Sequence, residues 1–229
     1  HRSIQAVDLI KYSIGPAVPN DLQRATDACQ SLTQAERTAI SDRAMLDAAI
    51  ELILEYGTEK TTLAMIGDKA GYSRGLATYR FGSKAGLYDA LCKSIGRNWL
   101  EYLKRGVDGK VGVDAMCAAL DTVYQWVTDS PEDARVLQIL HCGSASPGSE
   151  FKETSIGIHR RQQSDVVEWV EAGQQQGQIR QDIDVNAVAA EYVAYTSGIT
   201  YLWLISADTF NFDSANQAMK NYLRTTLSV

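Results

Sequence analysis

The sequence predicts an all-α fold, and three observations support that prediction. Apolar residues recur at helical spacing through most of the 229-residue chain. Alternating apolar and polar runs bounded by turns, which would indicate strands, do not occur in the sequence. Residues that cap helices stand directly before the periodic segments. We therefore expect an N-terminal group of three helices followed by a larger C-terminal helical domain.

Changes in composition divide the chain into three parts. Residues 1–40 have weak periodicity, and we expect them to form an N-terminal extension. Residues 41–105 contain the first helical group, which ends before a glycine-rich stretch at 106–112. Residues 106–229 carry 8 basic and 16 acidic side chains, so the expected C-terminal domain is strongly acidic.

The first helix is predicted at residues 41–57, where the apolar positions fall on one face. We expect Ser41 to cap its start and Gly57 to end it in the left-handed conformation. Either Thr61 or Thr62 then caps a second, short helix.

A third short helix is expected after a break at Gly71. Ser73 is its predicted cap, and the helix runs to about Arg80. Ser83 caps a longer helix that continues toward the glycine-rich stretch with its apolar residues on one side.

The C-terminal domain is predicted to contain five more helices. They lie at about 113–128, 131–142, 150–172, 184–206 and 213–227. The most apolar run, residues 193–206, is shorter than the roughly 20 residues that a membrane-spanning helix needs. We interpret it as a buried helix and expect no membrane partner.

A small basic cluster stands out in a chain whose formal net charge is −6. Between residues 60 and 84 the charged residues are Lys60, Lys69, Arg74, Arg80 and Lys84, with Asp68 as the single acid. A basic patch on an acidic protein indicates one anionic partner that docks at one place. A solvated face with an accidental excess of charge is the alternative, and charge alone does not decide between them.

The same segment has the layout of a helix-turn-helix unit, in which a tight turn joins two short helices. Gly71 permits the turn, and Gly75 keeps the surface of the third helix low enough to approach a groove wall. Such a helix places its first residues against base edges in the major groove. The absence of carboxylates between Lys69 and Lys84 fits this role, because an acid there would face phosphates.

These residues resemble the DNA-binding domain of the TetR family of transcriptional repressors. The matching residues are Thr62, Ile66 with Gly67, Ala70-Gly71-Tyr72-Ser73, Gly75, Tyr79-Arg80-Phe81, Ser83-Lys84 and Leu87. Their joint occurrence is specific, whereas any short piece is a weak signal. Two positions depart from the family pattern. Gly67 stands where alanine is usual, which loosens that helix by ~1 kcal/mol, and Arg80 stands where histidine is common.

The resemblance implies a double-stranded DNA operator as partner. It implies phosphate contacts from Thr62, Tyr79, Arg80 and Lys84 and base-edge contacts from Arg74, Gly75 and Thr78, with Ser73 at the start of the recognition helix. For Tyr79, packing inside the protein remains the alternative to a DNA contact.

The resemblance also implies that the acidic domain forms a homodimer and encloses a pocket for a small-molecule effector. The helices at 184–206 and 213–227 would supply half of a four-helix bundle across a two-fold axis. Small residues at helical spacing would let two subunits approach closely, unless they pack within one subunit. These are Ala189, Val193, Thr196, Ser197 and Thr200.

An effector pocket needs apolar walls and a few placed polar groups. The candidates are Trp99, Tyr102, Trp126, Leu137, His141, His159, Tyr195 and Trp203. Ordinary core packing is the alternative for each of them. Arg160 and Arg161 could receive an acidic or CoA-type ligand, although adjacent arginines more often form a solvated face.

Several classes of function are disfavoured by what the sequence lacks. The four cysteines are too far apart for a metal knuckle or a redox pair, and we expect no metal and no cofactor. Three histidines and no catalytic motif argue against an enzyme. The cysteine pattern and an opening segment without the apolar core of a signal peptide predict a cytoplasmic location.

Two alternatives to a DNA-binding repressor remain. One is a helical dimeric adaptor that binds an acidic protein through its basic patch, without sequence-specific DNA binding. Salt-dependent binding to random duplex DNA would distinguish this adaptor from a DNA-binding protein. The other is a DNA-binding protein that activates transcription.

Overall fold

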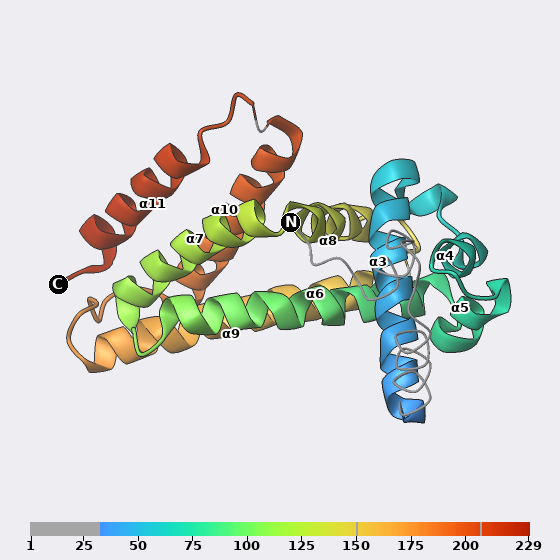
Figure 1. Ribbon diagram of the computed structural model, residues 1–229. Helices are drawn as coiled ribbons and strands as arrows, with labels where there is room; N and C mark the ends of the chain where they lie inside the picture. The colour runs from blue at the N-terminus through green and yellow to red at the C-terminus, as the bar shows by residue number, and fades with distance from the viewer. Residues whose placement is uncertain (1–32, 150, 207) are drawn as a thin grey trace, which may run out of the picture. The chain divides into compact units, whose positions relative to one another are not determined.

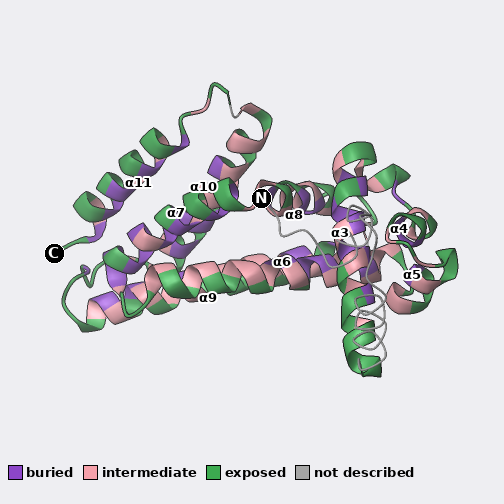
Figure 2. Cartoon of the chain, in the orientation of Figure 1, coloured by how far each residue is buried: buried purple, intermediate pink, exposed green. Residues whose placement is uncertain are grey.

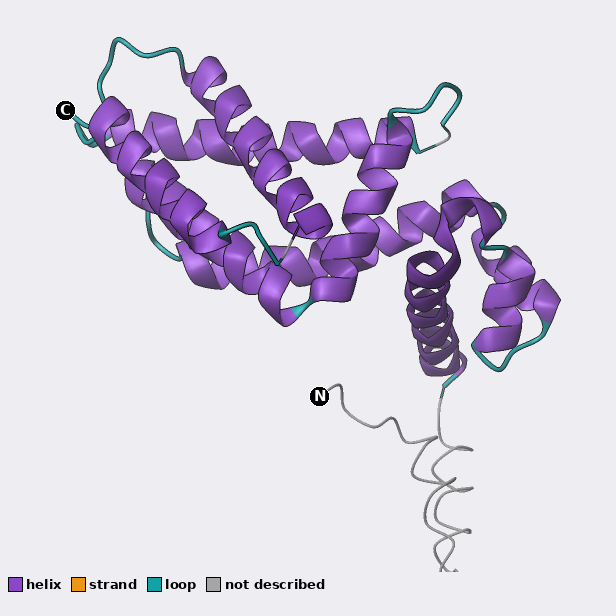
Figure 3. Ribbon diagram, turned by 90° about the horizontal axis from the view of Figure 1, so that it is seen from above, coloured by secondary structure: helices purple, strands orange, loops and turns teal. Residues whose placement is uncertain are grey.

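A computed structural model describes residues 33–149, 151–206 and 208–229 of the chain, so most of the expected extension at 1–40 lies outside the described residues. Those residues form helices joined by loops, with no strand among them (Figure 1, Figure 3). The helices are α3 (Gln34–Lys60), α4 (Leu63–Lys69), α5 (Arg74–Phe81), α6 (Lys84–Val107), α7 (Gly112–Asp129), α8 (Pro131–Ser144), α9 (Lys152–Gln175), α10 (Val185–Ser206) and α11 (Phe212–Leu227). The predicted all-α class is confirmed.

The start of α3 differs from the prediction. The helix begins at Gln34, and the expected cap Ser41 lies inside it with its hydroxyl donating to the Thr38 carbonyl. The Thr33 hydroxyl accepts from the Glu36 amide at 3.2 Å, and the Glu36 carboxylate accepts from the Thr33 amide at 2.7 Å. This reciprocal capping box sets the start, and sequence periodicity alone did not reveal it.

The end of the first helical run is close to the prediction. Gly57 has φ 78° and ψ 168°, which interrupts the helical path before Lys60. The positive φ is as expected, but this ψ is extended and not left-handed helical. Thr62, one of the two expected caps, accepts from the Met65 amide at 3.2 Å. Thr61 is buried and donates to the Gly57 carbonyl instead.

The turn between α4 and α5 is built as the sequence predicts. Gly71 has φ 79°, a value that side-chain-bearing residues rarely adopt. Ser73 occupies the cap position of α5, but its side chain makes no capping hydrogen bond, so that part of the prediction is wrong. At the next helix Ser83 accepts from the Gly86 amide at 3.1 Å, which confirms it as the cap of α6.

Two apolar clusters form the core of the residues from Met45 onward. The first joins α3, α4, α5 and α6 with α8 and the end of α7, and its fully buried members include Ile66, Leu87 and Leu91. The second joins α7, α9, α10 and α11 around Met116 and Leu120. Since α6 and α7 belong to both groups, the helix-turn-helix part is packed on the C-terminal helices through α6.

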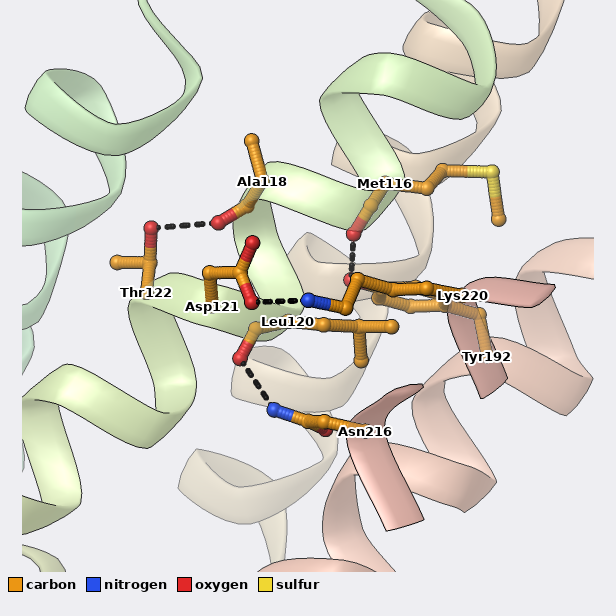
Figure 4. Close-up of polar contacts among 8 residues, drawn as sticks. All are labelled: Met116, Ala118, Leu120, Asp121, Thr122, Tyr192, Asn216 and Lys220. Atoms are coloured by element: carbon orange, nitrogen blue, oxygen red, sulfur yellow. Dashed lines mark hydrogen bonds and ion pairs between the residues drawn. The ribbon is translucent and has the colours of Figure 1, made fainter. Parts of the chain in front are cut away.

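Polar contacts attach α10 and α11 to α7 (Figure 4). Tyr192 of α10 donates to the Met116 carbonyl at 2.7 Å, and Asn216 of α11 donates to the Leu120 carbonyl at 3.0 Å. The Lys220 ammonium lies 2.6 Å from the Asp121 carboxylate, with its side chain only 8% exposed. These contacts hold α10 and α11 against α7.

None of the described helices has the length and apolarity needed to cross a bilayer.

Candidate DNA-binding surface and effector cavity

Helix α5 presents the predicted DNA-contact residues on its outer side. Ser73, Arg74, Gly75 and Thr78 are exposed, and Tyr79 exposes 82% of its surface. The structure therefore excludes the packing alternative for Tyr79. Ala77 is the residue of α5 that is fully buried, so the helix rests on the core by one side and leaves the opposite side free.

Arg74 already has a partner in the protein. Its Nε lies 2.8 Å from an Asp68 carboxylate oxygen, and its side chain remains 77% exposed. Asp68 belongs to α4, so the ion pair holds the guanidinium at the turn between the two short helices. An exposed ion pair of this kind stabilises the protein by about 0–1 kcal/mol, so Arg74 can exchange Asp68 for a DNA contact at little cost.

Lys84 is placed differently from the other predicted phosphate contacts. Its ammonium donates to the Thr58 and Glu59 carbonyls, both at 2.9 Å. The Tyr88 hydroxyl reaches the same Thr58 carbonyl at 3.1 Å. Lys84 thus ties the start of α6 to the end of α3, and its phosphate contact stays a prediction. Thr62 is exposed and Arg80 is half-buried.

Gly67, the departure from the family pattern, has a steric reason. A Cβ at this position would lie 2.7 Å from the Ser73 carbonyl oxygen. The glycine lets α4 and the start of α5 approach closely, and this packing offsets its lower helix propensity.

A cavity of about 150 Å³ lies among α6, α7, α8, α9 and α10. Its lining residues are Cys92, Gly96, Trp99, Leu103, Ala119, Val123, Trp126, Ala134, Leu137, Gln138, His141, Ile158, His159, Gln162, Asp165, Val166, Trp169, Tyr192, Val193, Thr196, Ser197 and Thr200. Most of them are apolar, as expected for a small-molecule site.

Five of the eight predicted pocket residues line this cavity: Trp99, Trp126, Leu137, His141 and His159. The rings of Trp99 and Trp126 meet edge to face, with centroids 5.5 Å apart. An indole wall of this kind suits a flat apolar ligand.

The other three predicted residues lie outside the cavity lining. Tyr102 donates to Asp129 at 3.3 Å, Tyr195 packs against both apolar clusters, and the Trp203 ring faces the Arg135 guanidinium. The sequence predicted these aromatic residues for the pocket, but helical spacing alone does not say which side of each helix faces inward.

Two histidines face each other in the cavity wall. The rings of His141 and His159 have centroids 5.2 Å apart. Burial and the neighbouring His159 lower the pKa of His141 to about 4, so His141 is neutral at neutral pH. His159 donates from Nδ1 to the Ser155 carbonyl at 2.9 Å, because a carbonyl oxygen can only accept.

The prediction missed two polar residues of α9. Gln162 and Asp165 line the cavity beside His159 and Trp169. Gln162, Asp165 and Trp169 follow His159 by three, six and ten positions, which places all four on one face of the helix. This spacing was a signal in the sequence. Burial raises the pKa of Asp165, although Arg161, whose Nε lies 2.9 Å away, opposes the shift.

The small residues of α10 do not form a free surface. Ala189 and Val193 are buried within the subunit, while Thr196, Ser197 and Thr200 line the cavity. The alternative of packing within one subunit is therefore the correct one.

A different side of α10 is exposed (Figure 2). Its exposed residues are Asn186, Ala187, Ala190, Glu191, Ala194, Gly198, Tyr201, Leu202 and Ile205. Glu191 is their only charged member, so α10 is apolar or small-sided almost all round. We call this surface the α10 outer face.

No group of three or more His, Cys, Asp or Glu side chains in the described residues could hold a metal ion. Cys92 lines the cavity, but burial raises the pKa of its thiol to about 12. That thiol is therefore protonated at neutral pH and does not act as a nucleophile.

Two family models match separate parts of the chain. Residues 45–91 match the bacterial regulatory proteins of the tetR family, and residues 117–228 match the C-terminal domain of BetI-type transcriptional repressors. The HTH-type transcriptional regulator TtgR of Pseudomonas putida is 26% identical over 175 residues, which cover 72% of this chain and 80% of TtgR.

Solved structures share the fold. A TetR-family regulator from Rhodococcus sp. aligns with a TM-score of 0.69 and 21% identity over 83% of this chain and all of that one. SmeT in complex with triclosan aligns with a TM-score of 0.72 and 18% identity, over 82% of this chain and 92% of SmeT. FadR from Bacillus subtilis, in complex with stearoyl-CoA, has a TM-score of 0.69 and 15% identity, over 80% and 97% of the two chains.

The matches to both family models cover the exposed recognition helix as well as the cavity-bearing domain. They do not favour an adaptor without DNA binding, and regulators of this kind are transcription factors and not enzymes. The chain belongs to the TetR family and is a DNA-binding transcriptional regulator of the repressor kind.

Proposed function

We propose that the protein is a homodimeric repressor that binds a palindromic operator and is released by a small, largely apolar ligand. The observation that carries this proposal is that α6 runs from the helix-turn-helix part to the cavity. Its first turn anchors the helix-turn-helix part through Lys84, and its later turns supply Trp99 and Leu103 to the cavity wall. One rigid helix therefore belongs to both sites.

The DNA-binding half of the proposal rests on the exposed side of α5. Arg74, Gly75 and Thr78, which we propose for base-edge contacts, are exposed, and so are Thr62 and Tyr79, which we propose for phosphate contacts. Carboxylates are absent from residues 70–83, and the Asp68 carboxylate beside this side is paired with Arg74 at 2.8 Å. A location in the cytoplasm, where the operator would be, follows as part of the proposal.

The dimer half of the proposal rests on the α10 outer face. A helix with apolar or small residues almost all round is normally covered on every side. The inner side of α10 is covered by α7 and α9, and a second copy of the chain would cover the outer face. Tyr222 of α11 is also exposed and would extend the contact. Two-fold pairing of this kind gives two recognition helices, as a palindrome requires.

The release mechanism is a shift in population between two arrangements of the dimer. A ligand that fits the cavity better when α6 is displaced stabilises the arrangement in which the recognition helices no longer match successive major grooves. SmeT with triclosan and FadR with stearoyl-CoA support a small-molecule ligand for a domain of this fold.

The test compares two tryptophan variants. A thermal-shift screen against small apolar and acyl-type molecules first identifies a ligand, and fluorescence anisotropy then measures its effect on operator binding. We expect Trp99→Ala to bind operator normally but to lose ligand-induced release. Trp203→Ala, which removes an aromatic ring outside the cavity lining, should keep it. Normal release by Trp99→Ala would refute coupling through α6.

A further inference from the structure

We propose that the cavity recognises a small neutral aromatic ligand by a hydroxyl group that donates to Gln162, and that it rejects carboxylates and phosphates. This inference rests on the proposed effector role of the cavity and adds the chemical class of the effector.

Three residues that line the cavity carry buried polar atoms without a partner in the described part of the chain, and we take these atoms as the groups that the ligand satisfies. Trp126 Nε1, His141 Nε2 and Gln162 Oε1 are buried and have no hydrogen-bond partner among the described residues. An indole N–H only donates and an amide oxygen only accepts. A hydroxyl group both donates and accepts, so it matches both kinds of atom. Gln162 is the firmest acceptor, because the role of a histidine nitrogen depends on its tautomer.

The second histidine adds to the acceptors. The Nδ1 proton of His159 is engaged by the Ser155 carbonyl at 2.9 Å. In the neutral ring, Nε2 is then left with a lone pair. Its neighbour His141 is 5.2 Å away between ring centroids. Gln162 Oε1 and the lone pair of His159 Nε2 both accept, so a ligand that donates a hydrogen bond is favoured over one that only accepts.

The charge of the lining argues against anions. Asp165 is the only charged residue among the lining residues, and no lysine or arginine is present there. Arg161 pairs with Asp165 but lines a neighbouring surface groove and not the cavity. Arg160 is exposed. A carboxylate or phosphate would therefore be desolvated without a cationic partner, which is strongly unfavourable.

Size and shape complete the description. A dry apolar cavity of about 150 Å³ holds one benzene-sized ring, and the present cavity has about that volume. Trp99, Trp126 and Trp169 supply flat walls. A single substituted aromatic ring with one hydroxyl fits these limits.

The test uses three ligands that differ in one group: 4-propylphenol, 4-propylanisole and 4-propylbenzoate. Isothermal titration calorimetry of the full chain at pH 7.5 measures the Kd of each. We expect the phenol to bind about tenfold or more tightly than the anisole, since one hydrogen bond is lost, and the benzoate to bind most weakly. Absence of phenol binding, an anisole that binds as tightly, or a benzoate that binds best would overturn the inference.

A pair of variants on α9 tests the residue assignment. Gln162→Met removes the buried acceptor, and Gln163→Met makes the same change at the adjacent exposed position. The phenol-to-anisole ratio should fall below about threefold in the first variant and persist in the second. An unchanged ratio in a folded Gln162→Met variant would refute the assignment. If circular dichroism shows that this variant does not fold, the ranking of the three ligands on the unaltered chain decides.

A separate readout distinguishes this inference from the proposed function. The same ligands are added to the protein bound to duplex DNA, and release is followed by fluorescence anisotropy. Phenol binding without DNA release would contradict the effector role and leave the ligand class intact. Release by the benzoate but not by the phenol would leave the effector role intact and refute the ligand class.

Discussion

Arg74 shows how one side chain can serve two partners. In the free protein its guanidinium is held by Asp68 at 2.8 Å, on the exposed side of the turn between α4 and α5. On DNA the same guanidinium can donate to the O6 and N7 atoms of a guanine. Because the pair with Asp68 is exposed, exchanging it for a base contact has a small cost.

We expect Arg74→Ala to lose about 1–3 kcal/mol of binding free energy at a single base pair and to relax specificity there. Lys84→Ala should instead weaken operator and random DNA alike and reduce the salt slope by about one. Because Lys84 also bonds two carbonyls at the end of α3, its variant should unfold at lower urea concentration. Anisotropy titrations on single-base-pair operator variants separate the two behaviours. A loss for Arg74→Ala that is the same on every sequence would contradict base reading.

His141 should make stability depend on pH. Its pKa is about 4 in the folded protein, below the ordinary value of 6.5, because burial and His159 oppose the charged form. The unfolded chain therefore binds the proton more tightly. The contribution is fully present above pH 6.5 and is lost as the pH falls toward 4. Between pH 7.5 and 4.5 the loss is about 2–3 kcal/mol.

Urea unfolding of the unaltered chain and of His141→Phe at these two pH values measures this contribution. The variant cannot protonate at that position, so its free energy of unfolding should fall less on acidification. Equal pH dependence in the two proteins would show that His141 is not held neutral by its surroundings.

At the scale of the element, α9 is fixed to its neighbours by a close backbone approach. A Cβ at Gly173 would lie 2.7 Å from the Gly112 Cα and 2.8 Å from the Ile179 Cδ1. A Cβ at Gly157, earlier on the same helix, would meet nothing within 4 Å. The two glycines therefore differ in environment while sharing one helix.

Gly173→Ala should lower the free energy of unfolding by about 1–3 kcal/mol, because backbone and a buried side chain must move. Gly157→Ala should raise it by up to about 1 kcal/mol, because alanine is the better helix former. Urea titrations of the two variants give both signs in one experiment. A stabilising Gly173→Ala would contradict the close packing of α7 on α9.

The α10 outer face predicts a variant that does not dimerise. Gly198 is exposed in the middle of this face, and a Cβ added to it would meet nothing within 4 Å. Gly198→Arg should therefore fold normally but bury an unpaired charge in a dimer interface. Sedimentation velocity should find a monomer, whereas Gln163→Arg on the exposed side of α9 stays dimeric. A dimeric Gly198→Arg protein would place the interface elsewhere.

The elements themselves were largely predictable from the sequence. Capping at Ser83 and the break at Gly71 are local effects that spacing reveals. The start of α3 was missed, because Thr33 and Glu36 lie in a segment of weak periodicity. The side of α10 that faces the cavity was also missed, because apolar and small residues surround almost the whole helix and the sequence does not distinguish its sides.

At the scale of the whole molecule, the cavity needed long-range packing that no local pattern contains. Trp99 and Trp126 were predicted as pocket residues because they are aromatic, and they do line the cavity. Tyr102, Tyr195 and Trp203 are aromatic too, but they lie outside the lining. The rotation of α6, α8 and α9 against α7 decides which aromatic side chains line the cavity. Fold class and the recognition helix are therefore readable from sequence, whereas the ligand site is set by tertiary structure.

The central claim is that two exposed copies of α5, paired by a two-fold axis, read one operator. In vitro selection of random duplexes by the full chain tests it most directly. We predict an enriched site with two inverted half-sites whose centres lie about 34–36 Å apart, and a changed preference at one position in each half-site for Arg74→Ala. Enrichment of a single unrepeated site, or no enrichment at all, would contradict the account.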